Sequence, residues 1–305
     1  MEVKLNAGTK VKSKDEVLSP WKVVWRRLKR NKLAVVGGYI LIFIILFSFV
    51  GPFLSPYKNE TTHLADAMKE PSLRHFLGTD EVGRDLFTRL MYAGRISLSV
   101  GIVAVLIEVL IGSILGAISG FYGGIVDGII MRIVDVFMCC PHLPLLIMLG
   151  AVMSDLKVPP QYRMYVVMLI IGFLSWAGLC RIVRAQILSL REQEFMQAAE
   201  ALGLRDRRKI FKHLLPNTFA SIIVAATLGI AGAILTESSL SFLGLGVTPP
   251  TPSWGTMIQA VSNTYVLRHQ PWIWMPPGIC IFLTVMAINL FGDGLRDALD
   301  PKLKR

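Results

Sequence analysis

Residues 33–54 read LAVVGGYILIFIILFSFVGPFL, and the uncharged interval around them extends from residue 33 to residue 57. A helix needs about 20 predominantly apolar residues to cross a bilayer. This stretch therefore predicts a transmembrane helix. It does not have the form of a cleavable signal peptide, because it begins after more than thirty residues and no A-x-A site follows it.

Similar apolar runs recur along the 305-residue chain, in which hydrophobic types make up 53% and charged types 17%, with a mean hydropathy of +0.55. Backbone groups in hydrocarbon must be satisfied within each segment, and these runs lack the alternation of a barrel strand. We therefore predict an all-α polytopic membrane protein, and we exclude the secreted, fibrous and disordered classes. The six expected transmembrane helices are residues 33–54, 98–121, 128–153, 165–183, 219–240 and 272–291.

The basic residues indicate the orientation of these spans. Of the 32 Lys and Arg residues, 23 fall on the side that holds both termini and 9 on the other side. Cytoplasmic loops carry the excess of Lys and Arg, so we expect both termini to be cytoplasmic. Topology thus explains the net charge of +11, and nucleic-acid binding is not expected.

The predicted organisation follows from these spans. The proline-rich residues 241–271 are expected to form a loop, because proline interrupts helices. The expected parts are a cytoplasmic tail with an amphipathic elbow helix at 1–32, the first transmembrane helix at 33–54, an extracytoplasmic segment at 55–97, a five-helix core at 98–292 that includes a cytoplasmic loop at 184–218 and an extracytoplasmic loop at 241–271, and a cytoplasmic tail at 293–305.

The elbow helix is predicted from PWKVVWRRLKRNK at residues 20–32. At helical spacing Trp21, Val24, Trp25 and Leu28 share one face, and basic residues lie between them. This pattern is typical of a helix that lies at the membrane surface beside anionic lipid headgroups. A regulatory or partner-binding helix is the alternative.

Small residues recur every four positions in the second expected span, at Gly112, Gly116, Gly120 and Gly124. A helix face without side chains lets another helix approach closely. The pattern predicts a packing partner, in this chain or in another.

Three acidic residues lie in or near the spans, and such residues are costly in a membrane. We expect Asp135 to pair with Arg132 at i, i+3. We expect Glu237 to reach water or to cap the following serine turn. Glu108 has no partner nearby in sequence, so it either serves a coupling ion or lines a water-filled cavity.

A stretch with several acidic residues, GTDEVGRDLFTRL at residues 78–90, lies outside the spans. It lacks the alternate ligand positions of a calcium loop. We predict a compact turn in which Asp and Arg side chains bond the backbone.

The most distinctive segment on the cytoplasmic side is EFMQAAEALGLRDRRKIFKHLLPN, residues 194–217. Its pattern predicts two short helices with a bend at Gly203 and an end at Pro216. A DNA-binding helix-turn-helix has the same outline, and its phosphate contacts would be Arg205, Arg207, Arg208 and Lys209. Because the segment is tethered between two spans, a docking surface for a cytoplasmic protein is the better interpretation.

This segment resembles the hallmark of the permease subunits of ABC importers, E-A-A-x3-G-x9-I-x-L-P. The matching positions are Gln197, Ala198, Ala199, Gly203, His213, Leu215 and Pro216. Gln197 replaces the usual Glu and His213 the usual Ile, and His-x-Leu-Pro-Asn is expected in the oligopeptide, dipeptide and nickel branch. Further similarity to the C-type permease of peptide importers lies at residues 76–101, 121–135, 237–255 and 289–305.

The resemblance implies a type I importer fold in a bacterial or archaeal plasma membrane. It implies a homologous second permease, two ATP-binding subunits and an extracytoplasmic peptide-binding protein as partners, with the seven matching positions contacting an ATPase. No Gly-Lys dipeptide occurs, so a phosphate-binding P-loop is absent from this chain. We therefore expect no enzymatic activity and no cofactor here, with ATP and Mg²⁺ on the partner subunits.

The substrate expected from the resemblance is a peptide, with nickel as the alternative. A nickel path favours His or Cys ligands at one depth, and only Cys139, Cys140 and His142 approach such a group. A secondary transporter that uses Glu108 is the alternative from another class of protein.

Overall fold

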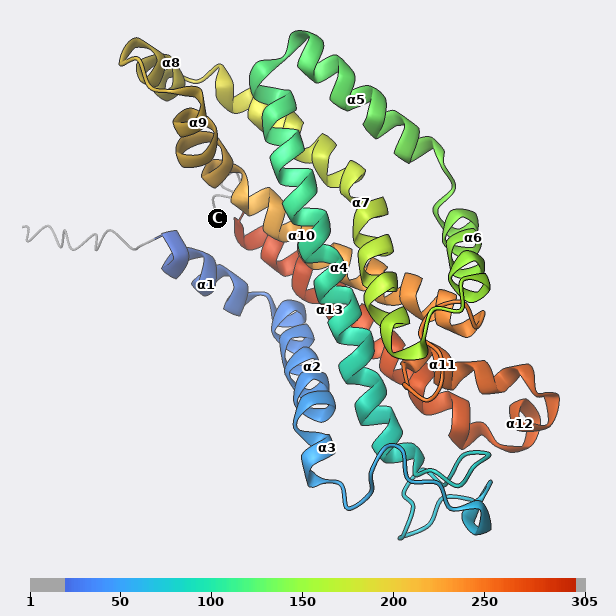
Figure 1. The fold of residues 1–305 in the computed structure, drawn as a ribbon. Helices are drawn as coiled ribbons and strands as arrows, with labels where there is room; N and C mark the ends of the chain where they lie inside the picture. The colour runs from blue at the N-terminus through green and yellow to red at the C-terminus, as the bar shows by residue number, and fades with distance from the viewer. Residues whose placement is uncertain (1–19, 300–305) are drawn as a thin grey trace, which may run out of the picture.

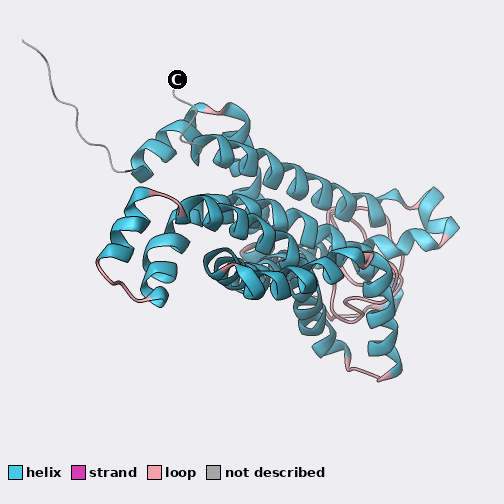
Figure 2. Cartoon of the chain, turned by 90° about the horizontal axis from the view of Figure 1, so that it is seen from above, coloured by secondary structure: helices cyan, strands magenta, loops and turns pink. Residues whose placement is uncertain are grey.

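The computed structural model describes residues 20–299, and its regular elements there are helices without strands (Figure 1). Short loops join most of them (Figure 2). The longer helices are α1 (Pro20–Arg30), α2 (Lys32–Phe49), α4 (Leu86–Tyr122), α5 (Gly124–Cys139), α6 (His142–Asp155), α7 (Pro160–Arg191), α8 (Glu194–Ala201), α10 (Leu215–Phe242) and α13 (Pro271–Leu299). The shorter ones are α3 (Gly51–Leu54), η1 (Leu64–Asp66), α9 (Asp206–Arg208), η2 (Lys209–Leu214), α11 (Trp254–Ile258), η3 (Gln259–Ser262) and α12 (Thr264–His269).

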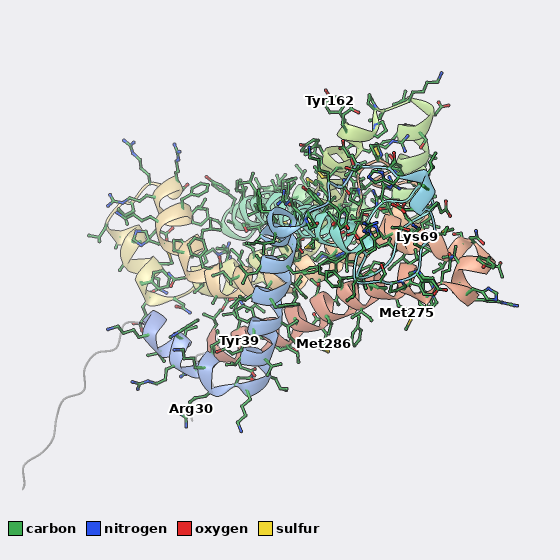
Figure 3. The ribbon with its side chains drawn as sticks, turned by 90° about the horizontal axis from the view of Figure 1, so that it is seen from below. Arg30, Tyr39, Lys69, Tyr162, Met275 and Met286 are labelled. Carbon is green, nitrogen blue, oxygen red and sulfur yellow. The ribbon has the colours of Figure 1, made fainter. Side chains whose placement is uncertain are left out.

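The predicted all-α membrane fold is confirmed. Within residues 20–299, five helical stretches are long and apolar enough to cross a membrane, and there are six if the bent pair of α5 and α6 is one span. The five stretches are 32–49, 86–122, 160–191, 206–242 and 271–299. Many apolar side chains point outward from the bundle, among them Tyr39 and Met275, which are 70% and 46% exposed (Figure 3). Such a surface fits a lipid or protein environment rather than water.

The two described ends of the chain lie at the same end of the bundle. In Figure 1, α1 and the last turns of α13 lie at the end that also carries α8 and α9. The loops after α3 and the hairpin at α12 lie at the opposite end. Of the two predicted tails, residues 1–19 and 300–305 lie outside the described residues, whereas residues 293–299 of the predicted tail 293–305 belong to α13.

The third expected span, 128–153, is not one straight helix. α5 ends at Cys139, α6 begins at His142, and the two helices meet at an angle of 81°. Pro141 explains the break, because proline lacks an N–H and disfavours the α conformation of the residue before it. Cys140 accordingly adopts an extended conformation, with φ −76° and ψ 125°.

Two further span boundaries differ from the sequence prediction. The first span is interrupted at Val50, where α2 gives way to the short α3. The second span belongs to a helix that begins at Leu86, so α4 takes up the last part of the predicted extracytoplasmic segment 55–97. Asp85 starts this helix, because its side chain accepts a hydrogen bond from the Thr88 N–H at 2.8 Å.

The glycine repeat of α4 packs against α7, so its partner helix lies in this chain. A Cβ on Gly112, Gly116 or Gly120 would lie 2.6–2.9 Å from a carbonyl oxygen of α7. The two backbones therefore touch along three turns. Gly124 takes no part in this contact, because no atom lies within 4 Å of its Cβ position.

The elbow helix forms at α1 as predicted. Leu28 is 6% exposed and packs in a cluster with Ala34 and Ala298, so part of the apolar face lies on α2 and α13. Trp25 is 59% exposed, and the Lys29 ammonium lies 5.1 Å from its ring centre. The side chain of Trp21 lies outside the described part of the structure.

The surroundings of two acidic residues differ from the prediction. Asp135 forms an ion pair with Arg181 of α7 instead of Arg132. Glu237 does not reach water, because it is fully buried, and its carboxylate accepts hydrogen bonds from Ser97 and Ser241 at 3.0 and 2.7 Å as well as from Ser238 of the predicted turn at 3.4 Å. Arg181 and Ser97 are the partners that lie far from these acids in sequence.

The stretch at residues 78–90 forms the predicted compact turn. The Asp80 carboxylate accepts hydrogen bonds from the backbone N–H groups of Val82 and Arg84 at 3.1 and 2.9 Å, and from the Arg84 side chain at 2.7 Å. The predicted loop 241–271 differs in part, since α11, η3 and α12 lie within it. Trp254 at the start of α11 is fully buried and anchors this loop in the core.

Candidate functional site: the hairpin between α7 and α10

Residues 194–217 project from one end of the bundle as a helix, a bend and a second helix. The bend forms at Gly203, which has φ +68°, as the sequence predicted. The Gly203 N–H bonds the carbonyl of Glu200 at 2.9 Å and the Leu204 N–H bonds that of Ala199 at 3.1 Å. This pair of bonds is a Schellman motif, which favours glycine in the left-handed conformation.

The two faces of α8 differ. Met196 and Ala199 are 4% and 5% exposed, and Met196 packs in a cluster with Ile210 and Leu214 of η2. Gln197 and Ala198 are exposed on the other side. Ala199, which the sequence had suggested as a partner contact, is therefore buried within this chain. Among the small residues that match the motif, Ala198 and Gly203 remain exposed and open to a partner.

The second helix does not end at Pro216, contrary to the sequence prediction. Pro216 lies in the first turn of α10, and the helical stretch continues from Asp206 to Phe242. Residues 209–214 form a π-helix, in which the Leu215 N–H bonds the Ile210 carbonyl. This local widening of the helix accommodates a residue that lacks an N–H.

Lys209 links three elements of the site. Its ammonium is 3.4 Å from a Glu200 carboxylate oxygen on α8, 3.0 Å from an Asp206 carboxylate oxygen, and 5.3 Å from the ring centre of Phe121 on α4. The side chain is 7% exposed. Lys209 is thus a structural link and not the open phosphate contact that a helix-turn-helix would need. Sequence reasoning missed this role, although the i, i+3 spacing of Asp206 and Lys209 was a signal for part of it.

Arg191 provides a second link at the end of α7. Its guanidinium donates hydrogen bonds at 3.3 Å to the carbonyl oxygens of Gly120 and Phe121. These carbonyls belong to the last turn of α4, where a cation is favourable. Arg191 therefore ties the end of α7, where the hairpin begins, to the end of α4.

The C-terminal part of the motif is closely packed. Leu214 is fully buried and Leu215 half-buried, and the Nε2 atom of His213 is buried without a hydrogen-bond partner among the described residues. The Asn217 side chain donates a hydrogen bond to the His213 carbonyl at 2.6 Å. His213 thus lies in the body of the hairpin, whereas Pro216 is exposed.

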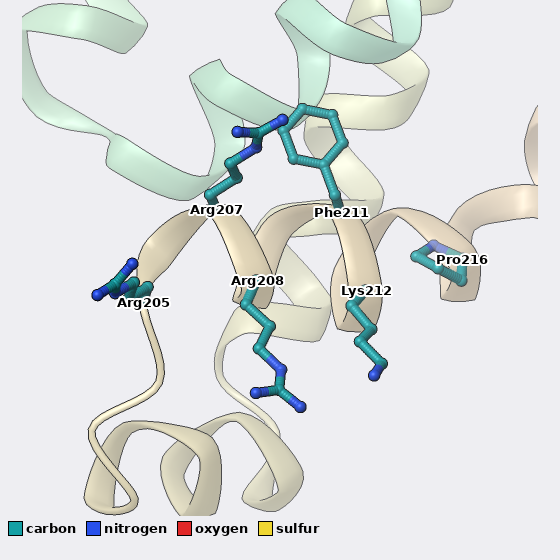
Figure 4. A pocket seen from close by; sticks show the side chains of 6 residues that line it. All are labelled: Arg205, Arg207, Arg208, Phe211, Lys212 and Pro216. Atoms are coloured by element: carbon teal, nitrogen blue, oxygen red, sulfur yellow. The ribbon is translucent and has the colours of Figure 1, made fainter.

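A basic hollow of about 480 Å³ lies beside the bend (Figure 4). Arg208 and Lys212 point from the same side of the helix in this view, and Arg207 and Phe211 point from another. None of the four basic side chains at this hollow, those of Arg205, Arg207, Arg208 and Lys212, forms an ion pair with a residue in 20–299. The hollow is lined by Arg205, Arg207, Arg208, Phe211, Lys212 and Pro216. This surface suits an acidic partner.

Metal ligation has no support in the described residues. No group of three His, Cys, Asp or Glu side chains within 20–299 could hold a metal ion. Cys139 is exposed at the end of α5, and Cys140 lies in the break before α6. The cysteines and His142 therefore do not form a site by themselves.

Comparison with known proteins decides the family. Residues 112–305 match the model of the binding-protein-dependent transport system inner membrane component, and residues 19–71 match the N-terminal transmembrane domain of oligopeptide transport permease C. The chain belongs to the binding-protein-dependent transport permeases. The fold is therefore that of a type I importer permease, as the sequence motif suggested.

This permease is similar to several named members of the family along nearly its whole length. It is 42% identical over 300 residues to the oligopeptide transport system permease protein OppC of Bacillus subtilis, which covers 98% of this chain and 95% of the relative. It is 44% identical over 281 residues to the dipeptide transport system permease protein DppC of the same organism, covering 92% and 85%. It is 42% identical over 291 residues to the glutathione transport system permease protein GsiD of Salmonella typhimurium, covering 95% and 93%.

Proposed function

We propose that this permease is the membrane-spanning subunit of an ATP-driven importer of dipeptides or oligopeptides. The observation that carries the proposal is its identity of 42–44% to permeases named for oligopeptide and dipeptide transport, over more than nine-tenths of the chain. The chain itself serves transport and not catalysis. ATP and Mg²⁺ belong to the partner subunits.

The partners follow from the family. A binding-protein-dependent system needs an extracytoplasmic binding protein, here one for peptides, and a homologous second permease completes the path. Two ATP-binding subunits dock on the side that carries α8. This side is the cytoplasmic one in a bacterial or archaeal plasma membrane, since both described ends of the chain lie there and the sequence assigns 23 of the 32 basic residues to it.

Coupling to the ATPases acts through residues 194–217. The exposed face of α8 carries Gln197 and Ala198, and the bend at Gly203 has no atom within 4 Å of its Cβ position. A groove of the ATPase can therefore approach this corner closely. Ala199, His213 and Leu215 hold the shape of the hairpin from inside, and Pro216 fixes its return into α10. The basic hollow beside the bend adds an attraction for acidic ATPase residues.

The alternatives have weaker support. A nickel permease would need a ligand set, and Cys139, Cys140 and His142 form none with the described part of the chain. A secondary transporter would need no docking hairpin. The reported relatives are named for peptide and glutathione transport.

The test is a reconstituted complex. A tagged chain should retain nucleotide-binding subunits and a second permease during purification. In proteoliposomes with the binding protein, labelled di- and tripeptide uptake should require ATP and should continue without a proton gradient. Uptake that survives ATP depletion and collapses with the proton gradient would contradict the proposal, as would ATP-driven uptake of nickel without peptide uptake.

A further inference from the structure

Glu108 is an acidic residue in the middle of a membrane-spanning helix. Ten residues of α4, about 15 Å, separate it from Leu98, where the predicted span begins. The exposed apolar side chains of α4 at this depth are Ile102, Val103, Leu106 and Leu110. Glu108 lies on the opposite side of the helix from Leu106 and Leu110 by helical spacing. It therefore points away from the outer apolar face of α4.

The carboxylate of Glu108 lies against a notch in α10. The Oε2 atom is 3.3 Å from the Cβ position of Gly229, so glycine leaves the room that the carboxylate occupies. One turn further along α10, the Cβ position of Gly232 has no atom within 4 Å. α7 closes another side at this level, where a Cβ on Gly172 would lie 2.7 Å from Ile107. Glu108 thus lies beside an open stretch of α10.

Glu108 has no partner in the described part of the chain. It forms no hydrogen bond and no ion pair with any residue in 20–299, yet it is not fully buried. The other intramembrane acids differ from it, since Asp135 pairs with Arg181 and Glu237 is surrounded by serine hydroxyls. An unpaired carboxylate at this depth is costly against lipid and is typical of a water-filled path.

We propose that Glu108 lines the substrate path and contacts positively charged groups of the transported peptide. The ligand class is a primary ammonium or guanidinium, from a Lys or Arg side chain or the peptide amino terminus. The inference rests on the proposed function in peptide import. The attraction between a carboxylate and such a cation is stronger in a partly desolvated wall than in bulk water, because the effective dielectric constant is lower there. The glycine positions of α10 leave space for it beside the carboxylate.

Two other partners for Glu108 lead to different outcomes. A basic residue of the second permease would make the carboxylate an assembly contact. If Glu108 instead bound a coupling proton or cation, the uptake of every substrate would depend on Glu108 to the same extent. The test must therefore compare a charged with an uncharged peptide and must also follow assembly.

The experiment uses the complete complex in proteoliposomes with saturating binding protein. ATP-driven uptake is measured for Ala-Lys-Ala and for Ala-norleucine-Ala, which match in length. The variants are Glu108→Gln, which removes the charge, Glu108→Asp, which keeps it, and Asp155→Asn, which makes the same change at an exposed residue at the end of α6. Any charge preference of the binding protein is the same in all of them.

We expect Glu108→Gln to lower the uptake ratio of the Lys peptide to the norleucine peptide about tenfold, or about 1.4 kcal/mol. Glu108→Asp should keep most of the wild-type ratio, and Asp155→Asn should leave it unchanged. An unchanged ratio in Glu108→Gln with normal ATP hydrolysis would overturn the inference. Loss of the second permease on purification, or an equal loss of both uptakes, would overturn it as well. If the wild-type complex imports neither peptide, the proposed function itself fails.

Discussion

The Ser97 hydroxyl of α4 donates a hydrogen bond to the Glu237 carboxylate of α10 at 3.0 Å, across 140 positions of sequence. The same hydroxyl accepts a bond from the Trp254 N–H at 3.2 Å, and Ser241 donates to the other Glu237 oxygen at 2.7 Å. These residues are fully buried. The carboxylate therefore joins two membrane helices to the loop that begins after α10.

Replacement of Glu237 should destabilise the permease. Glu237→Ala leaves the hydroxyls of Ser97 and Ser241 buried without this acceptor, and we expect a loss of about 3 kcal/mol. Glu237→Gln keeps the shape and one acceptor, so its loss should be about 1 kcal/mol. Thermal unfolding of the purified complex in detergent measures both. Equal unfolding temperatures for Glu237→Ala and the wild type would contradict a structural role for this network.

The contact between α4 and α7 predicts a sharp difference between two glycines. A Cβ on Gly116 would lie 2.6 Å from the Cys180 carbonyl oxygen and 2.9 Å from Val183 Cβ, so Gly116→Ala must push the helices apart. We expect a loss of about 1–3 kcal/mol and a lower yield of folded protein. Gly128→Ala is the control, because its Cβ position in α5 is open. The prediction fails if the two variants unfold at the same temperature.

The bend at Gly203 predicts a loss of coupling without a loss of insertion. Gly203→Phe meets no atom of this chain within 4 Å of its Cβ, although a φ of +68° costs a residue with a side chain about 1–2 kcal/mol. We expect the variant to insert but to lose the ATPases and substrate-stimulated ATP hydrolysis. Gln197→Glu, on the exposed face of α8, should retain both. Full coupling in Gly203→Phe would show that residues 194–217 are not the transmission element.

The basic residues of α1 predict the orientation in the membrane. Changing Arg26, Arg27, Lys29 and Arg30 to Glu removes four positive charges from the side with the larger basic count, so insertion should weaken or topology should invert. Protease accessibility of tags at the two termini measures the orientation, and expression level measures insertion. Unchanged accessibility and expression would count against cytoplasmic termini.

Local features of the fold could be predicted from the sequence. The apolar runs located the membrane helices, the basic pattern of α1 predicted its helix, and Gly203 predicted the bend. These signals depend on residues within one or two turns of each other. The break at Pro141 was also visible in the sequence, but the uncharged run around it indicated one continuous span.

Long-range pairings could not be predicted. Asp135 and Arg181 are 46 positions apart, and Arg132 at i+3 spacing was the nearer choice. Ala199 and Ala198 are adjacent and identical in type, so only the fold distinguishes the buried one from the exposed one. In the sequence, Lys209 cannot be distinguished from the basic residues beside it. Only the fold shows that its ammonium lies near Glu200 and Phe121.

The π-helix at residues 209–214 has a mechanical consequence. Because Pro216 does not interrupt the helix, residues 206–242 form one continuous helical stretch about 55 Å long. Lys209 attaches α8 to one end of this helix, and Glu237 connects the other end, through Ser97, to Trp254 in the loop after α10. If the hairpin receives the motion of the ATPases, as proposed, this continuous helix would carry the displacement to its other end, because no loop lies between residues 206 and 242.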